Sequence, residues 1–167
     1  PQSGDIFRAA RDAYARGSWE EVVQFMQQIT AAEPEAADPW YFIGEAYRFQ
    51  EKYSEALEAY EKAIVLNPNF GPAYVGRARV NLALNPKAEI LEDLDTAIEK
   101  DPAYVEAYLV RAAYKTDHED AKGALDDLKA AEALAPDSAL IQYEYARAYL
   151  ALDDIEKALA AAKRANE

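Results

Sequence analysis

Cysteine is absent from this chain of 167 residues, and histidine occurs only once. Without cysteine the chain has no disulfide, no thiolate metal site and no cysteine nucleophile. A single histidine excludes a metal site built on two histidines of one chain. We therefore predict a protein with no cofactor and no bound metal.

Glycine and long apolar runs are also scarce. The chain has six glycines, and no apolar run approaches the roughly 20 residues that a membrane span needs. Hydrophobic residues make up 51% of the chain, and alanine is prominent among them, which favours helix. The net charge of −13 repels nucleic-acid phosphates and anionic lipid surfaces. We expect no membrane insertion and no nucleic-acid partner.

No secretory signal stands at the start, because residues 1–10 lack an apolar core. The chain also starts without Met, and we expect it to be a piece cut from a longer protein. The compartment therefore stays open, with the cytoplasm favoured.

What the chain does contain is a proline at a fixed interval of 34 residues, at Pro34, Pro68, Pro102 and Pro136. A repeat of this length is typical of stacked helix pairs. Repeats 1 to 5 are then 3–36, 37–70, 71–104, 105–138 and the incomplete 139–167, with no insertion or deletion. We predict that residues 1–167 form a single array, with an extended surface suited to binding other chains.

The signals for helix ends are clearest in repeat 2. Asp38 followed by Pro39 predicts a helix start, with the aspartate as the cap. We expect helices over 40–50 and 54–66, joined by a short turn. Asn85–Pro86 carries the same signal at the internal turn of repeat 3.

Small residues recur where the two helices of a pair must touch. In the first helices these residues are Ala10, Gly44, Ala78, Ala112 and Ala146. In the second helices they come seven residues apart and so share one face, as in Ala56 and Ala63, Ala124 and Ala131, and Ala158 and Ala165. Larger residues fill the space between repeats, namely Trp40, Tyr74, Tyr108, Met26, Tyr60, Leu94 and Leu128. We assign packing, and no chemistry, to these positions.

This pattern resembles the tetratricopeptide repeat family. Repeat 2 carries the best match, in Trp40, Ile43, Gly44, Tyr47, Ala56, Tyr60, Ala63 and Pro68. The resemblance runs from Ser3 to Glu167 and implies an all-α fold, a right-handed α-α superhelix (solenoid) of about five stacked helix-turn-helix units. The departures are local, at Val22, Ile29, Ile90, Asn81 and Lys115.

The resemblance also implies that the first helix of each pair lines a concave groove. Three outward-facing lanes of groove residues follow from it. They are Phe7, Tyr41, Val75, Leu109 and Tyr143; then Arg11, Glu45, Arg79, Ala113 and Arg147; then Tyr14, Arg48, Leu82, Thr116 and Leu150. Packing within the superhelix, or plain solvation, is the alternative for these residues.

Charge is distributed unequally between the first helices and the rest of the chain. Residues 3–16, 37–50, 71–84, 105–118 and 139–152 hold nine Lys/Arg and seven Asp/Glu, a net charge of +2, and the rest holds nine and 24, a net charge of −15. Aromatic and arginine side chains are frequent in binding hot spots. We therefore expect the groove to hold a protein or peptide with apolar anchors and some acidic groups.

One known use of the family is the capture of the C-terminal carboxylates of heat-shock chaperones, which needs Lys, Asn and Arg at set positions. Here those positions carry Phe7, Arg11, Phe42, Pro72 and Gly76. We therefore expect a different ligand.

Catalytic or metal-binding groups could be sought among the acidic residues. Asp126 and Asp127 are adjacent on a helix and point in different directions, whereas Asp153 and Asp154 stand at a turn, where aspartate commonly caps. The run 117–120 around the single histidine falls at the internal turn of repeat 4. We predict no enzyme.

The predicted function is a non-enzymatic interaction module that binds a partner in its groove. The alternatives are a structural or self-associating scaffold and the targeting arm of a larger protein. Self-association is suggested because repeat 5 stops at Glu167 and no polar helix follows it, which would leave Tyr145, Tyr149, Leu152 and Leu159 partly exposed. The sequence does not identify the partner, the pathway or the total number of repeats.

Overall fold

The computed structural model describes residues 3–166, and for Ser3 the backbone alone. These residues form ten α-helices and no β-strand, so the all-α prediction is confirmed. The helices are α1 (Ser3–Ala15), α2 (Trp19–Ala32), α3 (Ala37–Phe49), α4 (Tyr53–Leu66), α5 (Gly71–Leu84), α6 (Leu91–Lys100), α7 (Val105–Asp117), α8 (Ala121–Leu134), α9 (Ala139–Ala151) and α10 (Ile155–Arg164). Each predicted repeat coincides with one pair of helices.

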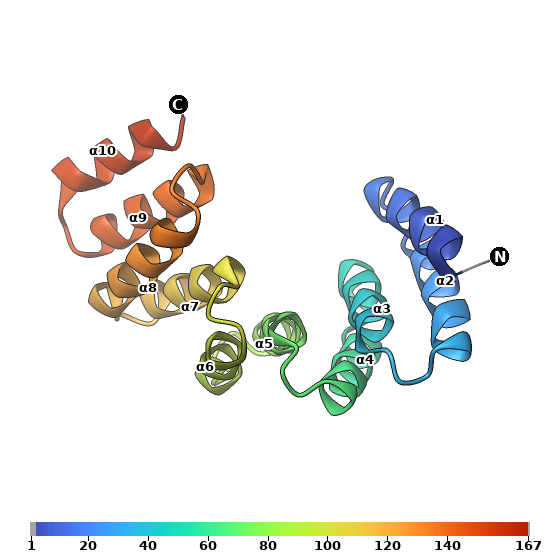
Figure 1. Cartoon of the computed structure of the whole chain (residues 1–167). Coiled ribbons are helices and arrows are strands. Elements are labelled where there is room, and N and C mark those ends of the chain that lie inside the picture. Colours follow the sequence, from blue (N-terminus) through green and yellow to red (C-terminus); the bar gives the residue numbers. More distant parts are fainter. Residues whose placement is uncertain (1–2, 167) are drawn as a thin grey trace. The chain divides into compact units, whose positions relative to one another are not determined.

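The chain divides into two compact parts. The N-terminal part, Pro1–Lys100, contains α1 to α6, and the C-terminal part, Asp101–Glu167, contains α7 to α10. In the N-terminal part each helix packs against the next, and α3 also contacts α5. Its helices α1 and α3 lie on one side and α2 and α4 on the other (Figure 1). The assignment of the whole chain to one array stays a prediction.

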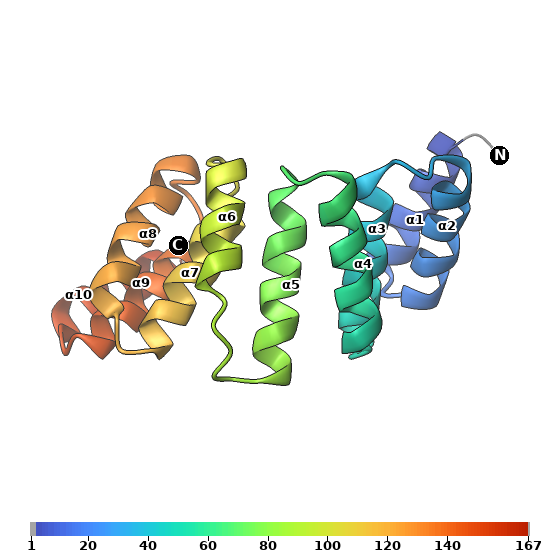
Figure 2. The same cartoon turned by 90° about the horizontal axis from the view of Figure 1, so that it is seen from below.

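In the C-terminal part each helix likewise packs against the next, and α7 contacts α9 as well as α8. Figure 2 shows the helices of each part from a second direction. First helices therefore touch one another in both parts, which is the arrangement that brings side chains of successive repeats onto one face.

Alanine and a few large residues form the core, as the repeat pattern predicted. Met26, Tyr60, Leu94 and Leu128 are all buried. So are the small residues Ala56, Ala63, Ala124 and Ala131 of the second helices. Close packing of helices needs such small side chains at the contacts.

Two predicted helix ends differ from the structure. Helix α3 begins at Ala37 with Ala36 as its N-cap, so the prediction that Asp38 caps this helix is wrong. Asp38 and Pro39 lie in its first turn, where an acidic residue suits the helix dipole and a proline removes an N–H that has no partner in the helix. Asn85 is the C-cap of α5 and does not start a helix. The next helix, α6, begins at Leu91.

The turn inside each helix pair repeats one backbone conformation. Gly17, Glu51, Glu119 and Asp153 have φ of 70°, 59°, 65° and 59°, and successive members lie one or two repeats apart. Repeat 3 has Asn85 at this position with φ of −143°. Pro86 follows it, and a residue before proline prefers an extended backbone. The turn of repeat 3 is longer for this reason, and α6 is shorter.

Candidate functional site

A cavity of about 460 Å³ opens in the N-terminal part among α1, α2 and α3. Phe7, Ala10 and Tyr14 of α1 line it together with Val22 and Met26 of α2 and Phe42 of α3. Helix α1 supplies side chains at intervals of three and four residues, which places them on one face. We call this the α1 pocket.

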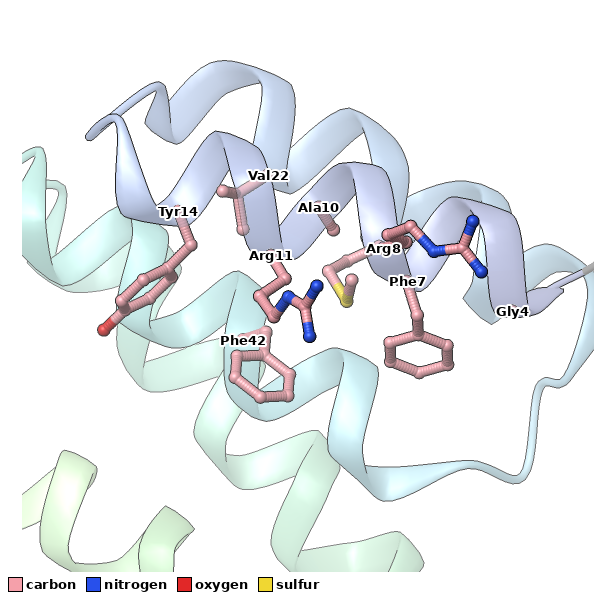
Figure 3. Close-up of a pocket in the computed structure, with 9 residues that line it drawn as sticks. Gly4, Phe7, Arg8, Ala10, Arg11, Tyr14, Val22 and Phe42 are labelled. Atoms are coloured by element: carbon pink, nitrogen blue, oxygen red, sulfur yellow. The ribbon is translucent and has the colours of Figure 1, made fainter.

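Two arginines stand at the α1 pocket, Arg8 and Arg11. Their side chains are 70% and 80% exposed, and their nearest carboxylates, Asp5 and Asp12, lie 3.9 and 4.0 Å away. Exposed pairs at such distances contribute little energy. Phe7, Arg11 and Tyr14 point from α1 to the side on which Phe42 lies, whereas Arg8 points away (Figure 3). Both guanidinium groups therefore remain available to an anionic group.

Tyr14 closes one end of the α1 pocket inside a cluster of aromatic rings. Its ring meets Trp19 edge to face at 5.1 Å and Phe42 at 6.5 Å, and Trp19 stacks on Phe49 at 4.4 Å. Burial, together with the nearby carboxylate of Glu45, raises the pKa of Tyr14. The phenol therefore stays protonated at neutral pH.

The structure brings three predicted groove residues together in the α1 pocket, namely Phe7, Arg11 and Tyr14. Sequence reasoning missed Arg8 and Met26 as pocket residues and considered Phe42 only as a departure from the chaperone clamp. The spacing of Arg8 and Arg11 on one helix was a signal that could have identified Arg8 as a pocket residue. Nothing in the repeat pattern marks Met26 as more than a core residue.

Three of the predicted groove residues are buried. Val75, Leu109 and Glu45 are 1%, 7% and 5% exposed. The expectation that they face outward is therefore wrong. Leu109 belongs to the apolar core of the C-terminal part, with Ala112 and Leu128.

Glu45 is held inside the N-terminal part by two partners. The hydroxyl of Tyr60 donates to Oε1 at 2.5 Å, and Arg48 donates through Nη2 to Oε2 at 2.7 Å. Burial and the Glu45 carboxylate raise the pKa of Tyr60. Because Arg48 and Glu45 pair with each other inside the N-terminal part, neither presents a free charge to a partner.

Several predicted lane residues are partly exposed. Tyr41, Arg79, Leu82, Ala113 and Thr116 are half-buried. Tyr41 packs edge to face on Phe42 and on Phe70, with ring centres 5.3 and 5.4 Å apart. A role of these residues in binding stays a prediction.

The C-terminal part exposes two of its predicted lane residues and engages a third. Tyr143 and Leu150 are 55% and 57% exposed. Arg147 donates to Asp117 at 2.6 Å and to Glu144 at 2.8 Å. Arg11 is therefore less engaged than Arg48 and Arg147.

The acidic pairs have structural roles. Asp127 is buried and accepts from Arg111 and, at 2.8 Å, from Lys115, whereas Asp126 points away to Lys129. Asp154 caps α10 by accepting from the backbone N–H of Lys157 at 3.2 Å, as predicted for this turn.

Residues 3–166 contain neither a metal-binding cluster nor a membrane-spanning helix. These residues hold no group of three or more His, Cys, Asp or Glu side chains placed to bind a metal ion. His118 ends α7, and its Nδ1 lies 2.8 Å from the carbonyl oxygen of Tyr114. In the same range no helix has the length and apolarity that crossing a bilayer requires.

Comparison with known proteins agrees with the repeat pattern and the paired helices. A family model described as tetratricopeptide repeat matches residues 37–70, which is the second predicted repeat. Residues 37–70 are a tetratricopeptide repeat, and the chain has the repeat pattern and the fold of that family. Tetratricopeptide repeats are generally not enzymatic and are scaffolds for protein–protein interaction.

Solved structures extend this likeness over nearly the whole tetratricopeptide repeat chain. A thermophilic tetratricopeptide repeat protein of Thermus thermophilus superposes with a TM-score of 0.83 at 21% identity, covering 98% of this chain and 89% of that one. A tetratricopeptide repeat protein titled as having an unusual peptide-binding site, YrrB, superposes with a TM-score of 0.67 at 23% identity, covering 93% and 80%. At these identities the likeness shows the fold alone.

Curated relatives share only a stretch of this tetratricopeptide repeat chain. Hsp70-Hsp90 organizing protein 3 of Arabidopsis thaliana is 32% identical over 94 residues, which are 56% of this chain and 17% of that protein. The cytochrome c-type biogenesis protein CycH of Pseudomonas aeruginosa is 32% identical over 108 residues, which are 62% and 26%. The chain spans between 12% and 26% of the length of the curated relatives that it matches.

Proposed function

We propose that this chain is a non-enzymatic module that captures a segment of a partner protein at the α1 pocket. The observation that carries the proposal is an apolar cavity of about 460 Å³ with two weakly paired arginines at its edge. An apolar side chain of the partner fills the space beside Phe7, Met26 and Phe42. An acidic group next to it pairs with Arg11, and Arg8 adds positive charge at the edge of the pocket.

The chemistry of the pocket favours such a segment over a small cofactor. Its lining is mostly apolar and aromatic, which suits a hydrophobic anchor, and its charged groups are arginines, which pair readily with carboxylates. The family resemblance assigns α1, α3 and α5 to the binding face, and the α1 pocket lies between two of these helices.

Chaperone tails are not the proposed ligand, although organizing proteins of Hsp70 and Hsp90 are among the relatives. The clamp positions carry Phe7, Phe42, Pro72 and Gly76. None of these side chains can pair with a carboxylate. Arg11 alone supplies a charge there, where the clamp needs an asparagine.

A comparison of two charge-matched variants tests the α1 pocket. Arg8→Glu with Arg11→Glu reverses both charges of the pocket, and Lys52→Glu with Lys87→Glu makes the same change of net charge at two exposed positions elsewhere. Each is used as bait in lysate of the source organism, with mass spectrometry of the retained proteins. We expect a protein that the native chain and the Lys52/Lys87 variant retain and the Arg8/Arg11 variant loses.

Circular dichroism shows whether the three baits are equally helical. If all three retain the same proteins, or none retains any, the arginines of the α1 pocket are not the binding site. A retained protein is then tested directly by calorimetry, where the loss of both arginine contacts should weaken binding by about tenfold or more, since interfacial charge pairs contribute roughly 1.5 kcal/mol or more.

A self-associating scaffold is the second candidate, and one observation favours it. Of the large apolar residues that are exposed in the described chain, five lie on α9 and α10, namely Leu140, Tyr143, Leu150, Ile155 and Leu159. Tyr149 and Leu152 are half-buried, whereas Tyr145 is buried. Exposed apolar groups gathered on one pair of helices are typical of an interaction surface.

A further inference from the structure

A second cavity in the N-terminal part lies between the α2–α3 turn and α4, and it shares no residue with the α1 pocket. Its volume is about 570 Å³, and Trp40, Val65, Leu66 and Pro34 supply its apolar lining. Val65 is 79% exposed, the largest exposure among the apolar residues that stand out at the surface of the described chain. We call this the Trp40 cavity.

Trp40 differs from the residues at the same position of the next two repeats. At the position of Trp40, repeats 3 and 4 carry Tyr74 and Tyr108, each of which donates its hydroxyl to the carbonyl of the preceding repeat proline at 3.1 Å. An indole has no hydroxyl with which to make this bond. Trp40 lacks that bond; it packs against the apolar core of the N-terminal part and also lines the cavity.

Val65 differs from its counterparts in the same way. One repeat further along the chain the residue is Glu99, and two repeats further it is Ala133. A polar or small residue is adequate at this exposed place, so packing does not demand valine. An aromatic side chain and an exposed aliphatic side chain thus line the same cavity.

The Trp40 cavity already accommodates a cation. The Nζ atom of Lys62 lies 4.1 Å from the centre of the Trp40 ring. An ammonium over an indole face is a favourable contact, and a guanidinium is more often found there. Lys62 is exposed, so an incoming cation can take its place at little cost.

Carboxylates complete the site. Glu58 and Glu61 line the cavity from α4 and are exposed. Among the described residues neither forms a salt bridge or a hydrogen bond, although Glu61 attracts the guanidinium of Arg77. The cavity thus offers an aromatic face, an aliphatic wall and two carboxylates to one ligand.

We propose that the Trp40 cavity binds a basic segment of a partner protein, with an arginine side chain over the indole of Trp40. The guanidinium displaces Lys62 and pairs with Glu58 and Glu61, and an aliphatic neighbour of the arginine packs on Val65. This ligand is opposite in charge to the one expected at the α1 pocket. The two surfaces are therefore tested independently.

The probe is the tripeptide acetyl-Leu-Arg-Leu-amide, titrated into the ¹⁵N-labelled protein. The chain has two tryptophans, so two indole N–H signals report on the titration, and Trp40→Tyr assigns them. We expect a saturable shift of the Trp40 signal, with the Trp19 signal as an internal reference. The citrulline tripeptide, which has the same shape and no charge, should bind at least about fivefold more weakly, as expected for the loss of a cation–π contact.

The repeat provides a matched control for the carboxylates. Glu58→Gln with Glu61→Gln removes the two charges of the cavity, and Glu92→Gln with Asp95→Asn removes two charges at the same positions one repeat later. We expect the first variant to weaken binding of the arginine tripeptide by about fivefold or more, and the second to leave it unchanged. The proposal is overturned if Trp40 does not respond, if the citrulline tripeptide binds as well, or if both variants weaken binding equally.

Discussion

The ring of Tyr60 fills the space that two glycines leave in neighbouring helices. A Cβ atom on Gly44 of α3 would lie 2.6 Å from Cε1 of this ring, and a Cβ on Gly76 of α5 would lie closer still. Tyr60 is fully buried, and its hydroxyl is bonded to Glu45. Three successive helices of the N-terminal part are thus held by one side chain that cannot move aside.

Replacing either glycine by alanine should therefore destabilise the protein. We expect Gly44→Ala and Gly76→Ala each to lower the free energy of unfolding by about 1–3 kcal/mol, as overpacking does. Urea unfolding followed by circular dichroism measures the change. Gly4→Ala is the control, because a Cβ at Gly4 meets no atom within 4 Å. An equal effect at Gly4 would contradict the role of Tyr60.

The same tyrosine makes stability depend on pH in the alkaline range. Burial, and then the Glu45 carboxylate, raise the pKa of Tyr60, whereas an unfolded tyrosine has a pKa of about 10. Below this pH both states keep the proton and the contribution is complete. Above it the unfolded state loses its proton first, so the free energy of unfolding falls by up to about 1.4 kcal/mol per pH unit for this residue.

Tyr60→Phe should make that fall less steep, and it should also destabilise the protein at neutral pH by about 1–3 kcal/mol, because Glu45 loses a partner while buried. Urea unfolding at a series of pH values from neutral to alkaline measures both effects. Tyr143→Phe, at an exposed position, should change neither. An unchanged slope in Tyr60→Phe would mean that other groups govern alkaline unfolding.

At the scale of elements, each helix pair closes through a residue with positive φ, except in repeat 3. Gly17 serves this turn in repeat 1 without strain, whereas Glu51, Glu119 and Asp153 have side chains there. A left-handed backbone costs a residue with a Cβ roughly 1–2 kcal/mol relative to glycine. Repeats 2, 4 and 5 thus carry backbone strain at this turn, whereas repeat 1 carries none.

Glycine at this turn should stabilise the other repeats. We expect Glu51→Gly to raise the free energy of unfolding by about 0.5–1 kcal/mol, after the greater entropy of glycine in the unfolded chain is allowed for. Glu55→Gly, four residues later in α4, should lower it by a similar amount. Thermal and urea unfolding of both variants measure the difference. If both lower stability, the turn carries no strain.

At the scale of the whole molecule, acidity and exposed apolar surface are the dominant features. The net charge of −13 keeps copies of the chain apart by repulsion. This acidity lies in the second helices and in the turns, but α10 carries Lys157, Lys163 and Arg164 against Glu156 alone. The exposed apolar residues of α9 and α10 therefore lie on helices that carry no net negative charge.

The second candidate function predicts association that depends on concentration and on these helices. Leu159→Glu places a charge among the exposed apolar residues of α10, and Leu134→Glu makes the same change on α8, where Leu134 is also exposed. Sedimentation velocity over a range of protein and salt concentrations should show a larger species that Leu159→Glu removes and Leu134→Glu retains. A monomer at every concentration would exclude this candidate.

The site was less predictable from the sequence than the fold. Three of the residues that line the α1 pocket followed from the repeat position, because Phe7, Arg11 and Tyr14 share one face of a helix. Val75 and Leu109 stand at the same repeat position as Phe7 but are buried. A fixed position in a repeat determines the direction of a side chain, and only its neighbours determine whether that direction leads to solvent.

By itself the sequence determined the number, order and pairing of the helices, because a proline every 34 residues follows the second helix of repeats 1 to 4 and small residues recur at most contacts within the helix pairs. These are local properties of backbone and side-chain volume. The tertiary structure alone decided that Glu45 is an internal partner of Tyr60, that Arg11 is weakly paired, and that Trp40 and Lys62 share a cavity with two carboxylates. These contacts join residues of different helices, and their distances depend on how the helices pack.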